Sequence, residues 1–339
     1  ALQLDSSLVD AWYNLASVHY QSRDYLAAAH AAEKAVSQKP DYLKAYLLKG
    51  RAELDYKLFD AAEKTIRTAL KRWPDEPTLL FNLALVYRYI EHTVEARKIY
   101  AELKGRFNEP QRLFQLGCLA YDDGDYEQAE KILREVLELQ NDFVPAHEAL
   151  NKLYWEHGNN ELFLQSFNQA LSRQPDSLAL AYSYLSHLYR AQQEQQANAL
   201  LDEFLQRFGE VHSLLHLKGG ALLRAGDWQQ AEVCYDKTLQ QQPRHPRYLI
   251  DQANLYLRQQ RYQEALALLD RAHENQPLDQ EVHAYKGLCW KLSGDTKKFD
   301  YLNDYQRYVK VGFLPTPAGY DSLEQFWDVL TQRIRELHK

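Results

Sequence analysis

The chain has 339 residues, of which 45% are hydrophobic and 26% are charged, and it contains only 13 Gly and 11 Pro. This composition is ordinary for a folded protein and excludes disorder for most of the length, while the low Gly and Pro counts disfavour a turn-rich β architecture. The 40 Lys and Arg against 47 Asp and Glu give a formal net charge of −7. That charge disfavours binding to nucleic acid or to an anionic membrane, because both reward a basic surface.

The cysteines and the first residues bear on compartment and completeness. Cys118, Cys234 and Cys289 are far apart and form no CxxC motif, so we expect free thiols in a reducing compartment. No run of about 18 apolar residues and no signal segment occurs, which predicts a cytoplasmic protein. Met is absent, and residues 1–5 are in register with residues 35–39 at the end of a later helix. We therefore expect the sequence to be a piece of a longer protein.

An internal repeat of 34 residues organises the chain, with one 33-residue unit between Ala96 and Ala129. The first recurring column holds small residues: Ala16, Gly50, Ala84, Gly117, Gly219, Ala253 and Gly287. The second column holds alanines: Ala28, Ala62, Ala96, Ala129, Ala197, Ala231 and Ala265. The spacing predicts a partial repeat at 1–8, eight full repeats at 9–279 and an atypical ninth from 280.

Each unit predicts two helices joined by a tight turn. Residues 11–20 show helical spacing of apolar residues, and a second helix follows residues 23–25. At Gly226 and Asp227 the glycine can end the first helix in a left-handed conformation and the aspartate can cap the second. Prolines such as Pro40 end the second helices. Each pair leaves an apolar side that only its neighbour can cover, which predicts an all-α solenoid.

The pattern Trp12-x2-Leu-Ala-x3-Tyr20, followed by Ala28 and Pro40, resembles the tetratricopeptide repeat (TPR). The resemblance covers residues 1–300 and implies a right-handed superhelix whose first helices line the concave surface. It further implies a non-catalytic scaffold that binds a protein or peptide segment. Departures from the pattern fall in the fifth and sixth units, at Asn151, Phe163 and Leu185.

Beyond residue 300 the repeat ends. Residues 301–319 read as a helix end and a Pro/Gly linker, and residues 320–339 as an amphipathic helix, which we expect to fold back and cap the solenoid. Residues 301–326 are also similar to the junction in bacterial proteins that join TPR repeats to a 2-oxoglutarate/Fe(II) oxygenase domain. That resemblance implies a recruiting arm for an oxygenase whose iron ligands lie beyond residue 339.

The sequence contains no GxxxxGK[ST], GxGxxG, GxSxG or HExxH motif, so we expect this chain to be non-catalytic and to hold no cofactor. The best candidate for a metal site is His212 with His216, four residues apart on one helix face, and Glu210 nearby. Surface exposure or packing is the commoner role for such a pair. We therefore predict no metal site.

Aromatic residues recur at the positions that face inward in the first helices. They form a candidate groove for a peptide, although tyrosines at such positions also pack under their own helical hairpins. The candidate groove residues of this kind are Tyr13, Phe81, Tyr89, Phe114, Tyr121, Trp155, Tyr182 and Tyr189.

The residue directly after the inward-facing position near the end of each first helix is charged in most units. Three arginines, Arg190, Arg224 and Arg258, follow one another at steps of 34 residues. Equivalent positions in a solenoid lie in line, so these guanidinium groups predict a ladder for carboxylates or phosphates. The partner is then a segment with an acidic part towards the C-terminal units. Pairing of each arginine with an acid on a neighbouring helix is the alternative. Acids fill the earlier equivalent positions, at Asp55, Asp122 and Glu156.

Overall fold

The computed structural model describes residues 9–159, 161–277, 279–310 and 312–337, and this part of the chain is helical with no β-strand. The first helices of successive pairs are α1 (Val9–Gln21), α3 (Leu43–Asp55), α5 (Pro77–Tyr89), α7 (Glu109–Asp122), α9 (Val144–Glu156), α11 (Leu178–Arg190), α13 (His212–Ala225), α15 (Pro246–Arg258) and α17 (Gln280–Ser293). The second helices are α2 (Tyr25–Gln38), α4 (Phe59–Leu70), α6 (Thr93–Glu102), α8 (Tyr126–Leu139), α10 (Gln165–Arg173), α12 (Glu194–Phe208), α14 (Trp228–Gln241), α16 (Tyr262–Asn275) and α18 (Thr296–Leu302). Beyond them lie α19 (Tyr305–Tyr308) and α20 (Leu323–Leu337).

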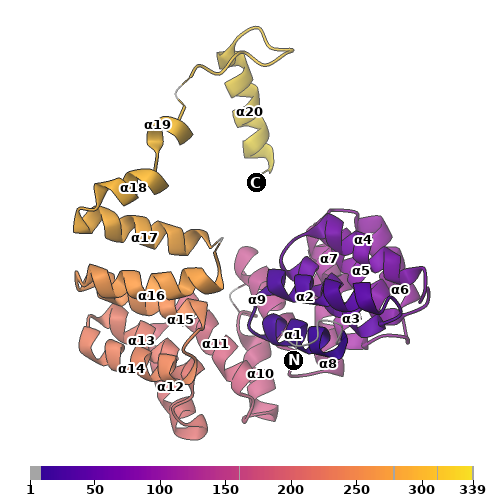
Figure 1. Cartoon of the computed structure of the whole chain (residues 1–339), viewed down its shortest axis with the longest axis horizontal. Helices are drawn as coiled ribbons and strands as arrows, with labels where there is room; N and C mark the ends of the chain where they lie inside the picture. The colour runs from indigo at the N-terminus through magenta and orange to yellow at the C-terminus, as the bar shows by residue number, and fades with distance from the viewer. Residues whose placement is uncertain (1–8, 160, 278, 311, 338–339) are drawn as a thin grey trace.

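The helix pairs wind into a superhelix, which confirms the predicted all-α solenoid. Helices α1–α8 gather at one side of Figure 1, α9–α11 lie in the middle, and α12–α17 form the other side. Each helix packs mainly on the helices before and after it in the chain, as expected for a repeat array.

Each of the nine turns from α1–α2 to α17–α18 has a residue with positive φ, between 58° and 83°, within two residues of the end of the first helix, and the α9–α10 turn has a second one, Leu164, at 64°. Four of the nine are glycines, which bears out the predicted glycine turn, and aspartates such as Asp227 then cap the following helix. The other five carry side chains in a conformation that costs about 1–2 kcal/mol for L-residues. The nine turn residues are Arg23, Lys57, Glu91, Gly124, Gly158, Gln192, Gly226, Gln260 and Gly294.

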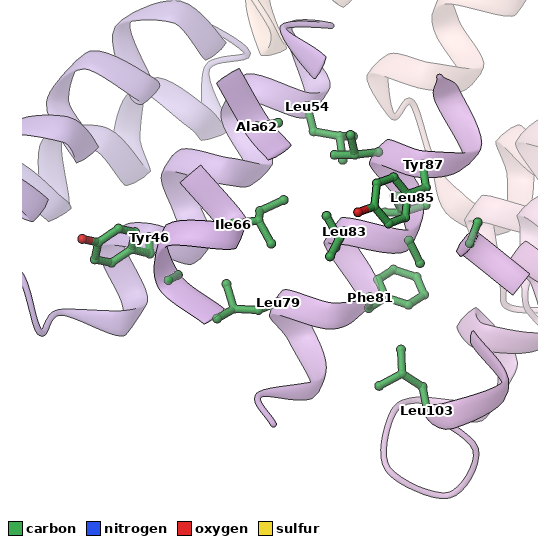
Figure 2. Packing of buried hydrophobic residues seen from close by; sticks show 14 of the residues in the cluster. Tyr46, Leu54, Ala62, Ile66, Leu79, Phe81, Leu83, Leu85, Tyr87 and Leu103 are labelled. Atoms are coloured by element: carbon green, nitrogen blue, oxygen red, sulfur yellow. The ribbon is translucent and has the colours of Figure 1, made fainter. Parts of the chain in front are cut away.

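The two small-residue columns lie where helices approach most closely. All seven alanines of the second column are fully buried. A Cβ added at Gly219 would lie 2.7 Å from Cε1 of Tyr235, and one added at Gly50 would lie 3.0 Å from Cγ1 of Ile66. Figure 2 shows the resulting core, in which Ile66 of α4 belongs to one cluster with Leu79 of α5. A larger side chain at Gly219 would push the paired helices apart unless Tyr235 moved.

Arginines near the ends of the second helices tie neighbouring units together. Arg207 Nη1 donates to the carbonyl oxygen of Pro175 at 2.9 Å, and Arg271 Nη2 donates to that of Pro243 at 2.6 Å. In each case the acceptor is the proline that follows the second helix of the preceding unit. These bonds satisfy carbonyl groups of the loop that follows each of these second helices.

The fifth pair departs from the repeat, at the place where the sequence does. Asn151 replaces the small residue, is fully buried, and accepts a hydrogen bond from the backbone N–H of Leu164 through Oδ1. Its Nδ2 donates to the carbonyl oxygen of His147 at 2.7 Å. Helix α10 consequently begins only at Gln165 and is the shortest second helix between α2 and α16.

The expectation that the last helix caps the solenoid is wrong for the described residues. Figure 1 shows α20 standing apart from the helix pairs. Trp327, Val329 and Ile334 are each 48% exposed, so part of its apolar surface remains uncovered. The segment before α20 forms little helix because Pro315 and Pro317 cannot sustain one, and it leads away from α17 and α18.

The turn between α1 and α2 faces the loop between α14 and α15 across a cavity of about 900 Å³. Arg23 and Asp24 line one wall, and His245 lines the other. Arg23 also acts electrostatically on His245 and Tyr248. The first pair and the start of the eighth therefore come close together across this cavity.

Two adjacent glycines provide a matched test of the helix contact. Gly219→Ala should destabilise the protein by about 1–3 kcal/mol, because the added Cβ meets the ring of Tyr235. Gly220→Ala should stabilise it by about 0.5–1 kcal/mol, because its nearest neighbour lies at 3.7 Å and alanine favours helix. Urea unfolding of both variants checks this. Midpoints that move in the same direction would contradict the assigned contact.

The turn conformation predicts opposite effects at two equivalent positions. Gly226→Val should cost about 1 kcal/mol or more through backbone strain, since φ is 83° and nothing lies within 4 Å of the added Cβ. Gln260→Gly, where φ is 62°, should stabilise by up to about 1 kcal/mol, because relief of strain outweighs the entropy that glycine loses on folding. Thermal or urea unfolding measures both changes, and an unchanged Gly226→Val midpoint would refute the strain.

Candidate ligand-binding groove

The first helices carry two separate pockets. The aromatic pocket, of about 440 Å³, is lined by Tyr13, Tyr20, Leu47, Phe81 and Phe107 among others. Phe81 is only 6% exposed and stacks on Phe107 with ring centroids 4.2 Å apart. Of the predicted groove residues, Tyr13 and Phe81 are thus brought together here, and Phe81 is mainly core.

The arginine pocket, of about 380 Å³, lies between α11, α13, α14 and α15. It unites five residues predicted from the sequence with Tyr235, which belongs to a second helix and which the column analysis missed. The pocket is defined by Tyr182, Tyr189, Arg190, Arg224, Tyr235 and Arg258. The ladder of equivalent positions is therefore a single recess rather than a spread-out row.

The three arginines differ in their pairing. Arg224 Nε donates to Glu194 Oε1 at 3.0 Å, and its guanidinium carbon lies 4.7 Å from the ring centroid of Tyr189. Both ion-pair partners are about half exposed, so this pair contributes little to stability. Arg258 Nε lies 3.5 Å from the side-chain oxygen of Asn254. Within the described residues Arg190 has no ion pair, so pairing with a neighbouring acid accounts for Arg224 alone.

The acids at the earlier equivalent positions are hydrogen-bonded or ion-paired to side chains of the preceding unit or of their own unit. Asp55 accepts a hydrogen bond from the hydroxyl of Tyr20 and pairs with Arg51. Asp122 accepts from Arg88 Nε at 2.8 Å. The N-terminal half of the groove is consequently not an open acidic surface. Its acids are hydrogen-bonded within the array, so the asymmetry along the groove comes mainly from the arginines.

Glu156, the third acid, accepts a hydrogen bond from the hydroxyl of Tyr121, whose ring carries the ammonium of Lys152 at 4.6 Å from its centroid. Tyr121 therefore ties α7 to α9. Trp155 is 55% exposed beside Phe163, with centroids 5.3 Å apart.

Two further predicted aromatics lie outside both pockets. Tyr89 is 51% exposed and stacks on Phe59, with centroids 5.4 Å apart. Phe114 packs against Phe143 at the same distance. Neither these two nor Tyr121 and Trp155 line the aromatic pocket or the arginine pocket.

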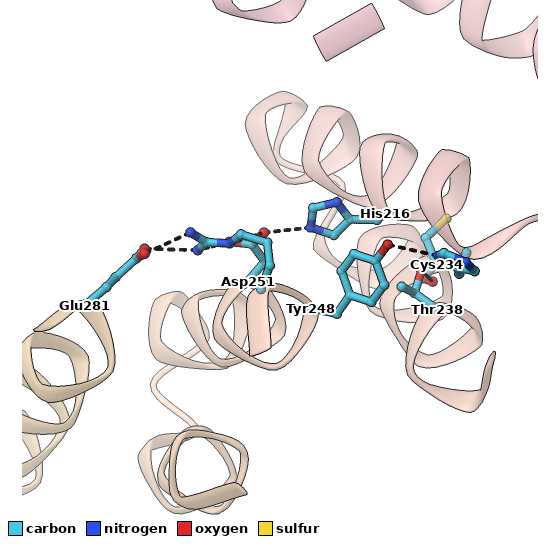
Figure 3. A network of polar contacts seen from close by, with 8 residues as sticks. His216, Cys234, Thr238, Tyr248, Asp251 and Glu281 are labelled. Atoms are coloured by element: carbon cyan, nitrogen blue, oxygen red, sulfur yellow. Dashed lines mark hydrogen bonds and ion pairs between the residues drawn. The ribbon is translucent and has the colours of Figure 1, made fainter. Parts of the chain in front are cut away.

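A chain of ionic contacts supports one side of the arginine pocket (Figure 3). His216 Nε2 donates to Asp251 Oδ2 at 2.6 Å, and Arg247 Nε donates to the same oxygen at 3.0 Å. Arg247 also makes a bidentate pair with Glu281 at 2.8 and 2.9 Å. Burial acts to raise the pKa of Asp251, but the hydrogen bond from His216 and the charge of Arg247 outweigh it and hold that pKa below its usual value.

The histidine pair considered as a metal site makes other contacts. His212 Nδ1 lies 2.9 Å from the hydroxyl of Tyr248, while His216 faces Asp251. Glu210 pairs instead with Lys237 Nζ, at 2.7 and 2.9 Å. Across the described ranges no group of three or more His, Cys, Asp or Glu side chains could hold a metal ion.

Comparison with known families decides the class of protein. Residues 13–77, 47–108, 114–177 and 216–280 match the tetratricopeptide repeat, and the matches together span more than half of the chain. The chain belongs to the tetratricopeptide repeat family. TPR arrays generally bind protein partners, so the family supports the broad class of interaction scaffold.

One curated relative is protein O-mannosyl-transferase TMTC3 from Homo sapiens, 25% identical over 248 residues, which are 72% of this chain and 20% of that protein. The chain thus spans about a fifth of that relative's length. Among its helices in the described ranges, none is both long and apolar enough to cross a membrane.

Three solved structures are similar to this TPR chain. A tetratricopeptide repeat protein from Parabacteroides merdae is 19% identical, and the match covers 68% of this chain and 91% of that protein's chain, with a TM-score of 0.43. PilF of Pseudomonas aeruginosa is 19% identical over 67% and 99% of the two chains, with a TM-score of 0.46. Human IFIT1, solved as a dimer with m7Gppp-AAAA, is 15% identical over 79% and 68%, with a TM-score of 0.47.

His245, in the loop between α14 and α15, predicts a pH dependence of stability. Its burial and the charges of Arg23, His216, His212 and Arg247 lower its pKa to about 4. In the unfolded chain a histidine protonates at about pH 6.5, so the unfolded state binds more protons between these values and stability falls as the pH drops from about 6.5 to 4.

The variant His245→Phe, which can keep the stacking on Tyr248 at 3.9 Å, should lose less stability over that interval. Urea midpoints at about pH 7, 6 and 5 measure the difference. His147 and His273, whose pKa values burial also lowers, remain in the variant and leave part of the slope. Equal slopes in variant and parent would show that His245 is not held neutral in the folded state.

Proposed function

We propose that this chain is an interaction module that binds an extended segment of a partner protein along the inner face of the superhelix. The observation that carries the proposal is the convergence of Arg190, Arg224 and Arg258, from three successive units, on one recess. Repeated positions on a rigid array suit a segment that runs along the superhelix axis.

The two pockets suit different kinds of side chain in the two parts of the segment. The aromatic pocket offers Tyr13, Leu47 and Phe81 to apolar side chains. The arginine pocket offers forked donors to acidic groups. The acidic part of the segment would therefore lie towards α11–α15, and its apolar part towards α1–α5.

The recruiting arm of an oxygenase remains a prediction from the resemblance of residues 301–326. Tyr301, Tyr305 and Phe313 in this segment are strongly exposed, at 87%, 63% and 103%. The scaffold role is compatible with such an arm, and equally with a place inside a longer enzyme of the TMTC3 kind. The partner-binding proposal does not depend on either.

A fluorescent peptide with one aromatic half and one acidic half tests the proposal directly. Anisotropy titration measures binding, and a photo-reactive group placed in either half locates it. The acidic half should cross-link to α11–α15 and the aromatic half to α1–α5. Absence of binding by this peptide and by its reversed form, or cross-links confined to the outer second helices, would refute the groove.

Charge reversal separates the arginine pocket from general charge. Arg224→Glu should weaken binding of the peptide by about 1–3 kcal/mol, because charge-assisted hydrogen bonds are lost. Arg97→Glu is the control, since Arg97 is 45% exposed and pairs with exposed Asp123 much as Arg224, 47% exposed, pairs with Glu194. Arg97 lies on α6, outside both pockets.

Urea midpoints of the two variants should stay close to each other, because both arginines are exposed. If both variants lowered the affinity for the peptide equally, net charge alone would attract it.

A further inference from the structure

We infer that the arginine pocket takes the phosphoryl group of a phosphorylated side chain in the bound segment. The inference rests on the proposed function, because the groove must hold the segment that carries the phosphate. It adds the class of residue that the pocket selects, a phosphate monoester in preference to a carboxylate.

Charge and donor number distinguish the two anions. A phosphate monoester carries about −1.5 to −2 charges at pH 7 and three acceptor oxygens, whereas a carboxylate carries one charge and two oxygens. Arg190, Arg224 and Arg258 present three positive charges and forked N–H donors to one recess. A single carboxylate would leave at least one guanidinium without an anionic partner, whereas a phosphate can engage all three.

The acids near the pocket do not cancel this charge. Asp251 lines the recess but already accepts hydrogen bonds from His216 and Arg247. Glu194 pairs with Arg224 from an exposed position, at 55% exposure, and an exposed pair of this kind is easily exchanged for a better anion. Among the described residues Arg190 and Arg258 have no carboxylate partner, so two guanidinium groups are available without breaking an ion pair.

The floor of the pocket is shaped for a tethered group. A Cβ at Gly220 would lie 3.7 Å from Arg224 Nη1 and 3.8 Å from the hydroxyl of Tyr235, which are ordinary contact distances, so this glycine lies directly beside a cation and a phenol. Tyr182 and Tyr189 form walls on the α11 side. A phosphate on a short side chain can reach this floor from a peptide backbone that lies along the first helices, which favours a phosphopeptide over a free phosphate.

Three capped pentapeptides that differ at one position provide the probe: Ala-Ala-X-Ala-Ala with X as phosphoserine, glutamate or serine. Isothermal titration at pH 7.5 and low salt should give the phosphoserine form at least about tenfold higher affinity than the glutamate form, and no measurable binding of the serine form. Inorganic phosphate should compete at least tenfold more weakly than the phosphoserine peptide. Equal affinities of phosphoserine and glutamate peptides would overturn the inference and leave the groove proposal standing.

Variants locate the binding. Arg190→Gln and Arg258→Gln should each lower the phosphoserine affinity about five- to tenfold, while Arg97→Gln on α6 should change it less than twofold. Gly220→Leu should block the pocket, and Gly220→Ala, which makes only ordinary contacts, should not. The assignment would be overturned if Arg97→Gln lowered the affinity as much as Arg258→Gln does. It would also be overturned if inorganic phosphate competed as strongly as the phosphopeptide. Failure of all three pentapeptides while the longer acidic peptide binds would overturn it as well.

Discussion

The close contact between paired helices at the small-residue columns is the constraint on which the rest of the structure depends. Where Gly219 faces Tyr235 the neighbouring ring leaves no room for a side chain on the first helix, and where Gly50 faces Ile66 an added Cβ would be in tight contact. Small residues recur at this position in most units, so most pairs can pack in a similar way. Residues at equivalent positions then lie in line, which is why arginines spaced 34 residues apart meet in one pocket.

Sequence periodicity was sufficient to predict the helices and the turns, because these follow from local rules repeated many times. It could not show that five turns adopt the left-handed conformation without glycine, since only glycine marks that conformation in a sequence. Neither could it predict the late start of α10, where the buried amide of Asn151 accepts a hydrogen bond from the backbone N–H of Leu164 just before the helix. The position of α20 depends on a long linker with no periodic signal.

For the groove, repeat-equivalent positions in the sequence identified the residues of the first helices but not the side chains that contact them. Tyr235 enters the arginine pocket from α14, and Asp251 is neutralised by His216 one unit earlier and by Arg247 one helical turn before it. Such pairs cross between units, 34 to 36 residues apart as in Arg247 with Glu281 and His212 with Tyr248. Reading the sequence at one repeat length plus or minus a residue or two would have found them. The same rule explains why Asp55, Asp122 and Glu156 are bound within the array.

The near-closure of the superhelix between the turn at Arg23 and the loop at His245 has a mechanical consequence. A solenoid behaves as a spring, in which a small change of angle between neighbouring pairs adds up along the array. The gap between the first pair and the eighth is where that sum becomes a displacement. A segment that fills the groove and stiffens the intervening pairs would alter the pitch, and so the width of this gap, without touching either wall. The distance across it would then report occupancy of the groove from a position remote from the bound segment.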